Sequence, residues 1–333
     1  MSEDTDAKVR PEPAAKSRQH AGAVAEPDEV LSPAPTAPRR RRVTWTPYVL
    51  LVPAVVILLA ALAYPVGWQL VTSTQQFGLA QQFHVPPDFV GAANYLTLLA
   101  DPQVWTVVAR SLAFCLVNAI LTVLIGVGLA MLMNAVGRLP RLILQIALLL
   151  AWAMPVVASM TVFVWLFNWH TGVVNWLLTR LGFDYVNHNW LASPLSFYFV
   201  ATVIVVWMSV PFVSFSVYAG LTQISGEVLE AAQLDGAGGW RRFANITLPM
   251  IRPVLMIVLL LQIIWDLRVF TQIKLLQDAG APIASTDLLG TYIYRLGVAS
   301  SDFGMAAAMS VFVLILTILV SAPYVRSLIK EDN

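Results

Sequence analysis

The sequence predicts an all-α integral membrane protein with six transmembrane helices. Of its 333 residues, 58% are hydrophobic and only 12% are charged, which is more apolar side chain than the interior of one soluble domain can bury. The apolar residues gather in stretches that each reach the roughly 20 residues a helix needs to cross the hydrocarbon core. Because an open strand would leave unpaired amides in lipid, these stretches are expected to be helices.

Six stretches qualify, and few charged residues interrupt them. The expected spans are Thr46–Val71, Val104–Met133, Leu142–Trp169, Leu195–Leu221, Leu248–Val269 and Phe303–Val325. The preceding segment, 1–43, is rich in Pro, Ala and charged residues and holds almost no large apolar side chains. It cannot bury enough surface to offset chain entropy, so we expect a disordered cytoplasmic tail. Its length and charge, without a small-residue cleavage site, argue against a secretory signal.

Lysine and arginine are distributed unevenly around these spans. With the amino terminus inside, eleven basic residues lie near the membrane on the cytoplasmic side and five lie on the outer side. Because positive residues concentrate in cytoplasmic loops, both termini are expected to be cytoplasmic. The connections 137–141 and 222–247 then face the cytoplasm, while 72–103, 170–194 and 271–302 face outward.

The cytoplasmic segment 222–247 is too long for a tight turn. Its first part has the features of a short helix: Ser225 is a residue type that caps helix amides, and Glu227 suits the positive end of the helix dipole. The run containing Glu230 ends at Gly236, which permits a chain reversal. The sequence therefore predicts a helix outside the membrane, between spans four and five, at which another protein docks.

This segment resembles the cytoplasmic loop signature of binding-protein-dependent ABC importer permeases. The matching residues are Glu230, Ala231, Ala232, Asp235, Gly236, Leu248 and Pro249. Nine residues separate Gly236 from Ile246, as in that family. There the loop forms a coupling helix in a cleft of the ATP-binding subunit, and the resemblance implies that role here. An isolated Glu-Ala-Ala is merely a good helix former, so the glycine offset and the Leu-Pro ending carry the argument.

Further patterns are similar to the carbohydrate-uptake branch of the family, near the larger maltose-type permease. Phe89–Tyr95 and Leu276–Arg295 resemble its outer-loop patterns, and Asp302–Gly304 resembles the start of its last helix. The large periplasmic insertion of the maltose protein is missing, because the outer segment after the first span is short. The resemblance implies a six-helix permease domain over 44–333 in the cytoplasmic membrane of a prokaryote, forming half of a translocation pathway.

The same resemblance implies the partners. They are a second permease subunit, a dimer of ATP-binding subunits, an extracytoplasmic sugar-binding protein and a di- or oligosaccharide substrate. No phosphate-binding loop of the form GxxxxGK[ST] occurs in the sequence, so ATP and Mg are expected on the separate ATPase, and this chain is not expected to be an enzyme. The formal net charge of +1 gives no sign of a nucleic-acid partner.

Polar and aromatic residues within the spans are candidates for a substrate pathway, because polar groups in lipid are costly and aromatic rings stack on sugars. The candidates are Asn118, Gln145, Trp152, Asn168 and Gln262. Hydrogen bonding between helices is an open alternative for the amides, and anchoring at the bilayer surface for tryptophans such as Trp190. Asp266 is expected near the outer end of the fifth span, where solvation or a surface ion pair is an alternative to a role in the substrate pathway.

Other residues have structural interpretations. The pairs Gly126 and Ala130, and Gly304 and Ala308, have the four-residue spacing that lets helices approach closely. Cys115 has no second cysteine to pair with and is expected to be a packing residue. The histidines lack metal-ligand spacing, so no metal site is expected.

Two other classes of protein remain as alternatives. A stand-alone ion-coupled secondary sugar transporter would have internal repeats and broken helices around membrane-embedded charges. A membrane-bound enzyme acting on lipid-linked sugar would need carboxylates or a histidine clustered at a membrane edge. Neither pattern is visible in the sequence.

Overall fold

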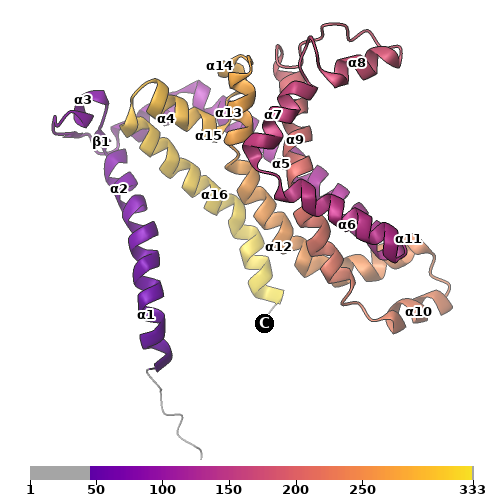
Figure 1. Cartoon of the computed structure of the whole chain (residues 1–333). Helices are drawn as coiled ribbons and strands as arrows, with labels where there is room; N and C mark the ends of the chain where they lie inside the picture. The colour runs from indigo at the N-terminus through magenta and orange to yellow at the C-terminus, as the bar shows by residue number, and fades with distance from the viewer. Residues whose placement is uncertain (1–45, 332–333) are drawn as a thin grey trace, which may run out of the picture. The chain divides into compact units, whose positions relative to one another are not determined.

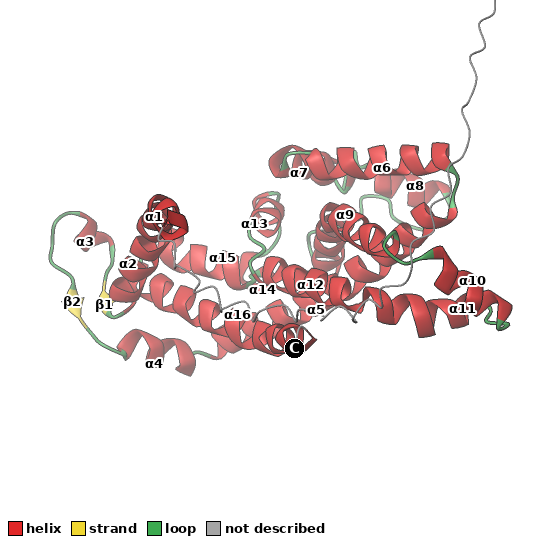
Figure 2. Cartoon of the chain, turned by 90° about the horizontal axis from the view of Figure 1, so that it is seen from below, coloured by secondary structure: helices red, strands yellow, loops and turns green. Residues whose placement is uncertain are grey.

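The computed structural model describes residues 46–331, with side chains from 49 to 326, and most of these residues are helical (Figures 1 and 2). The chain divides into two compact units, 1–55 and 56–333. Of the first unit only the beginning of helix α1 (Thr46–Leu58) is described, so the tail predicted for 1–43 lies outside the described residues. The packing and the sites below belong to the second unit.

Within the described residues, five helical stretches are long and apolar enough to cross a membrane. They are Val49–Ser73, Pro102–Ala135, Pro194–Leu221, Gly239–Asp278 and Phe303–Arg326. The long helices in them are α1 with α2 (Tyr64–Ser73), α5 (Pro102–Ala135), α9 (Pro194–Leu221), α12 (Leu248–Leu267) and α16 (Phe303–Glu331). Four of these stretches each contain one expected span, and Val49–Ser73 covers Thr46–Val71 except for its first three residues, so these five spans are confirmed.

The third expected span, Leu142–Trp169, is a bent pair of helices. Helices α6 (Arg138–Ala153) and α7 (Val156–Leu166) meet at 100°. Pro155 lies at the break, where it supplies no amide hydrogen and pushes Met154 out of the helical region, to a ψ of 127°. The prediction of one continuous helix is therefore wrong here, and residues 46–331 hold six candidate spans when this pair counts as one.

Short elements fill the connections. Between α2 and α5 lie β1 (Gln75–Gln76), α3 (Leu79–Gln82), β2 (Asp88–Phe89) and α4 (Ala93–Ala100), with β1 and β2 paired antiparallel. Helix α8 (Val173–Arg180) lies between α7 and α9. Helices α10 (Gly226–Leu234) and α11 (Gly239–Arg242) connect α9 to α12. Helices α13 (Thr271–Asp278), α14 (Ile283–Thr286) and α15 (Leu289–Tyr294) connect α12 to α16.

Three π-helical turns also occur in the described part of the chain. They are η1 (Leu59–Ala63), η2 (Phe243–Thr247) and η3 (Arg295–Ala299). Each follows an α-helix without a break, and η1 and η2 also run directly into the next one. Such turns are often found where a helix bends or meets a functional site.

Helices α5 and α9 form the centre of the packing. Gly126 of α5 lies so close to α9 that a Cβ added there would fall 2.5 Å from Val213 Cγ1. Ala130 and Ala308 are completely buried, and Gly304 is buried where α16 begins. The predicted close packing at these small residues is confirmed.

Three buried clusters surround this pair. One joins α5, α6, α9 and α12, the second joins α4, α5, α12, α15 and α16, and the third joins α5, α7, α9 and α13. Cys115 belongs to the second cluster, where its Sγ lies 3.6 Å from the carbonyl oxygen of Ile263, so its predicted packing role is confirmed. Trp190 is buried in the third cluster, and its Nε1 donates to Asn175 Oδ1 at 2.6 Å. Its indole ring therefore packs inside the protein and is not exposed on its surface.

The carboxyl end of α5 is capped by a basic residue of the next helix. Arg141 Nε donates to the carbonyl oxygen of Met133 at 2.7 Å, and its Nη2 donates to that of Val136 at 2.9 Å. The last carbonyls of a helix lack partners of their own and carry partial negative charge, so an arginine there satisfies both needs. Arg141 thus fixes the short turn between α5 and α6.

We expect Gly126→Ala to destabilise the protein, because its new methyl group would overlap Val213, a β-branched side chain with little freedom to move. Overpacking of this kind costs about 1–3 kcal/mol. The matched control is Gly128→Ala on the same helix, where an added Cβ meets nothing within 4 Å. Thermal unfolding in detergent should show a lower midpoint for the first variant alone, and equal midpoints would contradict the close contact.

Candidate functional site

The predicted helix outside the membrane is present as α10. Glu227 lies in its first turn, as predicted. Ser225 has the extended backbone of a capping residue, but its side chain makes no capping hydrogen bond. The capping prediction is therefore wrong at Ser225. The residue is exposed, so water competes for its hydroxyl and for the first amides of the helix.

The end of α10 is fixed by two backbone hydrogen bonds. The amide of Gly236 donates to the carbonyl of Gln233 at 3.1 Å, and the amide of Ala237 donates to that of Ala232 at 3.0 Å. This pattern is a Schellman motif, which requires a left-handed residue after the helix. Gly236 supplies it with a φ of +80°, a conformation that costs any residue with a Cβ about 1–2 kcal/mol. The predicted chain reversal is confirmed.

Most of α10 lies on the surface of this chain. Glu230, Ala231 and Asp235 are exposed, while Ala232 is buried against the chain itself. Leu234 is 89% exposed, which is unusual for a leucine outside a membrane span. An exposed helix with acidic and apolar groups side by side is suited to a protein partner.

The return to the membrane is helical throughout. α11, η2 and α12 follow one another without a loop, and Leu248 and Pro249 are exposed at the start of α12. Arg242 of α11 donates from Nη1 to Gln233 Oε1 of α10 at 3.2 Å. Figure 1 shows α10 and α11 side by side at the end of the bundle opposite α13 and α14.

Two of the predicted pathway residues are buried and polar. Gln262 is fully buried and donates from Nε2 to Asp266 Oδ1 at 2.9 Å. Asn118 is also fully buried and donates to the carbonyl of Phe114 on its own helix at 2.7 Å. Within the described part of the chain, Asn118 Oδ1, Gln262 Oε1 and Asp266 Oδ2 have no hydrogen-bond partner. Such atoms are costly in a span unless something else binds them.

The other three predicted pathway residues lie apart from this group. Gln145 is half-buried on α6, and Trp152 is exposed near the end of the same helix. Asn168 follows α7, where its Oδ1 accepts from the amides of His170 at 2.9 Å and Thr171 at 3.0 Å. Its side chain therefore orders the turn after the helix.

A pocket of about 410 Å³ opens beside Asp266. Its walls include Val205, Ser209, Trp265, Arg268 and Gln272, from α9, α12 and the beginning of α13. An aromatic ring, a carboxyl group, a hydroxyl and a guanidinium together can bind the apolar face and the hydroxyl groups of a sugar.

The sequence misplaced or missed several of these residues. Solvation was one alternative for Asp266, but the residue is only 3% exposed, so that alternative is wrong. Ser209 and Arg268 were not selected, since the sequence does not reveal which face of a span each residue occupies. The adjacent Trp265 and Asp266 inside an apolar run were the available signal. Among the described residues, no group of three or more His, Cys, Asp and Glu side chains could hold a metal ion.

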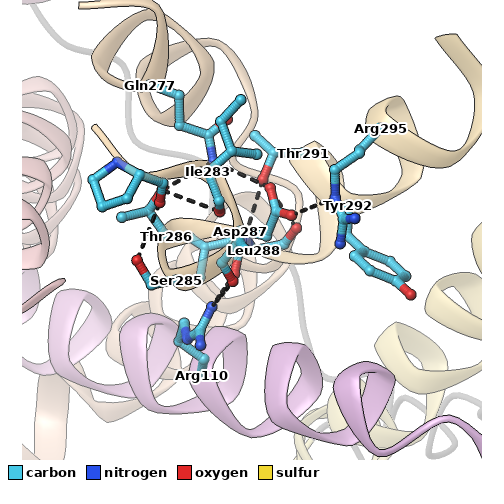
Figure 3. Close-up of polar contacts among 12 residues, drawn as sticks. Arg110, Gln277, Ile283, Ser285, Thr286, Asp287, Leu288, Thr291, Tyr292 and Arg295 are labelled. Atoms are coloured by element: carbon cyan, nitrogen blue, oxygen red, sulfur yellow. Dashed lines mark hydrogen bonds and ion pairs between the residues drawn. The ribbon is translucent and has the colours of Figure 1, made fainter. Parts of the chain in front are cut away.

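A second polar cluster lies at the opposite end from α10 (Figure 3). Asp287 is completely buried and accepts from Arg295 Nε at 2.8 Å and from Gln277 Nε2 at 3.1 Å. Its backbone carbonyl accepts from Arg110 Nη1 of α5 at 3.2 Å. This cluster ties the connection between α12 and α16 to α5.

Tyr292 extends the cluster toward the start of α5. The guanidinium of Arg295 lies 4.8 Å above its ring, and its hydroxyl donates to Asp101 Oδ2 at 3.3 Å. Burial, followed by the nearby carboxylate of Asp101, raises the pKa of Tyr292. The hydroxyl therefore stays protonated and remains a hydrogen-bond donor at physiological pH.

Two of the patterns noted in the sequence, Phe89–Tyr95 and Asp302–Gly304, contact the same segment, 73–77. Asn94 Nδ2 donates to the carbonyls of Ser73 and Gln75, each at 2.9 Å. Gly304 donates from its amide to the carbonyl of Phe77 at 2.9 Å, and a Cβ there would fall 2.3 Å from the Gln75 oxygen. These contacts join the end of α2 to α4 and to the start of α16.

We expect Asp287→Asn to cost about 2–3 kcal/mol of stability, less than for a fully buried pair because the Arg295 side chain is 30% exposed. The matched control is Asp278→Asn, which breaks the more exposed ion pair of Asp278 with Lys274 and should cost less than about 0.5 kcal/mol. Thermal unfolding midpoints measure both changes. Equal shifts for the two variants would show that Asp287 does not hold the connection in place.

Comparison with known proteins identifies related sequences and a similar fold. The model of the family described as "Binding-protein-dependent transport system inner membrane component" matches residues 122–326, more than half of the chain. A crystal structure of a bacterial ABC transporter involved in alginate import contains a chain that superposes with a TM-score of 0.73. The match covers 86% of this chain and 96% of that chain at 24% identity, so it supports the fold.

Characterised relatives are more similar in sequence. The diacetylchitobiose uptake system permease protein DasB of Streptomyces coelicolor is 40% identical over 86% of this chain and 88% of its own length. The trehalose/maltose transport system permease protein MalF of Thermococcus litoralis is 32% identical over 84% of this chain and 92% of its own. This chain therefore belongs to the family of inner membrane components of binding-protein-dependent transport systems, and it is a multi-pass permease.

Proposed function

We propose that this permease is the membrane-spanning subunit of an ATP-driven importer for a neutral di- or oligosaccharide. Two relatives are named as permeases for diacetylchitobiose and for trehalose and maltose, and these names support the substrate class. The aromatic and polar lining of the pocket beside Asp266 agrees with it. Membership of the family argues against the stand-alone ion-coupled carrier.

The proposed assembly has several partners. A dimer of ATP-binding subunits binds ATP and Mg on the cytoplasmic side, and a sugar-binding protein delivers substrate on the other side. A second permease subunit completes the pathway, of which this chain forms half. The family's description as binding-protein-dependent supports the delivery protein, and the lack of a nucleotide loop in this sequence supports a separate ATPase.

The proposed topology places both termini and α10 in the cytoplasm. Basic residues near the membrane support it, because Arg138, Arg141, Arg241 and Arg242 lie at the turns on the α10 side. The connection from α13 to α15 then lies outside, where the binding protein docks.

One observation carries the proposed coupling role: α10 is exposed, yet it is firmly joined to two spans. Four residues, 222–225, separate it from α9. On the other side the Gly236 reversal leads into the continuous helix that begins with α11 and becomes α12. A push on α10 by the ATPase is therefore passed to both spans, as one packed element moving others.

In this mechanism Glu230 and Asp235 offer charged contacts to the ATPase, and Leu234 fills an apolar site on it. Closure of the ATPase dimer on ATP shifts α10, and α9 and α12 follow to open the pathway toward the binding protein. Hydrolysis restores the inward-facing state. Sugar leaves the binding protein and passes the pocket beside Asp266 on its way inward.

We expect Gly236→Val to reduce sugar uptake at least about tenfold while the subunit still inserts. A β-branched residue is strained at a φ of +80°, and the free energy of this strain is about 1.4 kcal/mol or more. Glu230→Lys should act similarly by reversing a contact charge. Uptake and ATP hydrolysis are measured on the assembled transporter in proteoliposomes.

The control for this experiment is Gly238→Ala in the same connection. Gly238 has a φ of −64° and open space around it, so an added methyl group causes no strain and uptake should stay within about twofold of the wild type. Normal uptake by both Gly236→Val and Glu230→Lys would refute the coupling role of α10.

A second experiment tests the pathway. Gln262→Leu removes the group that donates to Asp266 and leaves a buried carboxyl group without a partner. We expect uptake to fall about tenfold, the rate equivalent of ~1.4 kcal/mol, with the thermal unfolding midpoint lowered only modestly. The matched control is Gln145→Leu on α6, which should retain uptake. A larger loss of uptake for Gln145→Leu than for Gln262→Leu would place the pathway along α6 instead.

A further inference from the structure

An apolar groove runs between α5 and α9, away from the pocket beside Asp266. Its upper part has a volume of about 410 Å³ and is lined by residues that include Phe114, Val117, Tyr198 and Phe199, with Arg110 at one end. Its lower part has a volume of about 480 Å³, shares Leu121, Phe199 and Thr202 with the upper part, and is closed on one side by α6. We call the two parts together the α5–α9 groove.

The length of the upper part matches one leaflet of a bilayer. Arg110 and Leu121 lie eleven residues apart on the single helix α5, which corresponds to about 16 Å along its axis at 1.5 Å per residue. The hydrocarbon core is about 30 Å thick, so half of it is about 15 Å. A chain that starts at Arg110 therefore reaches the middle of the membrane at Leu121.

The arginine at the upper end is held in place by the protein. Its Nη1 donates to the carbonyl of Asp287 at 3.2 Å and lies 3.4 Å from that of Ala284. Arg110 remains partly exposed. The carboxylate of the nearby Asp287 is itself bound by Arg295 and Gln277. Arg110 bonds to the connection between α13 and α15, which the proposed topology places outside, and a guanidinium fixed there is well suited to bind a phosphate group.

The walls below Arg110 are apolar. Phe114 and Tyr198 pack with ring centroids 5.7 Å apart at the upper end, and aliphatic side chains follow on α5. A transmembrane helix of a partner would cover the groove with apolar side chains, but it would supply no anion to pair with the arginine at the upper end of the groove. A phospholipid satisfies both parts of the groove, since it carries an anion at the surface and a hydrocarbon chain below.

We propose that the upper part of the α5–α9 groove binds one acyl chain of an anionic phospholipid, with its phosphate group at Arg110. The bound lipid fills the space between two spans that otherwise touch closely at Gly126 and Val213. In the proposed topology the site belongs to the outer leaflet.

The experiment uses the assembled transporter in nanodiscs that contain phosphatidylglycerol with a photoreactive group in its acyl chain. Labelled peptides are then mapped by mass spectrometry. We expect labelling to concentrate on Val117, Leu121 and Thr202 over Leu116 and Leu124, two exposed residues of α5 outside the groove lining.

Two variants of neighbouring residues form a matched pair. Val117→Trp fills the groove and should reduce labelling of α9 at least about fivefold, whereas Leu116→Trp, one residue along on another face of α5, should leave it within about twofold. Arg110→Gln should remove the preference for phosphatidylglycerol over phosphatidylcholine. Cooperative thermal unfolding shows that the variants remain folded, with a lower midpoint expected for Arg110→Gln because it loses its hydrogen bonds to the carbonyls of Ala284 and Asp287.

Two outcomes would overturn the proposal. Even labelling of all exposed faces of α5, unaffected by Val117→Trp, would mean that only bulk lipid surrounds the helix. A photoreactive amino acid at residue 117 that captures a partner permease instead of lipid would assign the groove to a protein interface.

Discussion

Hydrocarbon offers no partner to a backbone amide, and this one constraint organises the permease. Peptide groups in the membrane are paired mainly inside their own helices, so most of the described spans are long helices and the break at Pro155 is an exception. The ends of helices, where amides and carbonyls lose their partners, need separate solutions. Arg141 provides one for α5, and the Gly236 reversal provides one for α10. The sites described above lie at or near such helix ends.

The two buried carboxylates of the described residues, Asp266 and Asp287, each lie in a group of polar side chains. Asp266 and Gln262 share a hydrogen bond within α12, with a pocket beside them. Asp287, Arg295 and Gln277 satisfy one another in the connection that follows (Figure 3). In the first group some oxygen atoms have no hydrogen-bond partner and are available to a transient ligand. In the second group the carboxylate accepts two hydrogen bonds, as a structural support requires.

Much of the fold could be predicted from the sequence because the bilayer sets a single length scale and a single type of secondary structure. Spans such as α5 and α9 follow directly from apolar length, and α10 follows from its charge, its glycine and its place between spans. The bend at Pro155 was missed because a proline inside a span can be tolerated, as Pro211 is within α9. Neighbouring helices decide between these outcomes, and a single sequence does not show them.

The candidate site could be predicted only in part, for a similar physical reason. The coupling segment is local, so its spacing could be recognised, and Gly236 has the backbone conformation that its position implied. The pathway depends on which face of each helix points where. Asn168 orders a turn, Asp266 is buried, and Ser209 lies in the pocket wall. Three-dimensional neighbours determine each of these roles, and apolar spans carry too little periodic contrast to reveal them.

The contact between Gly126 and Val213 has a mechanical consequence. Gly126 has no Cβ, and the stiff branched side chain of Val213 packs directly against it, so the two helices interlock at this point. α9 therefore cannot slide or turn without carrying α5 along. In the proposed mechanism, the element that the ATPase moves is then this pair of helices, so the movement is passed to two spans and not to one.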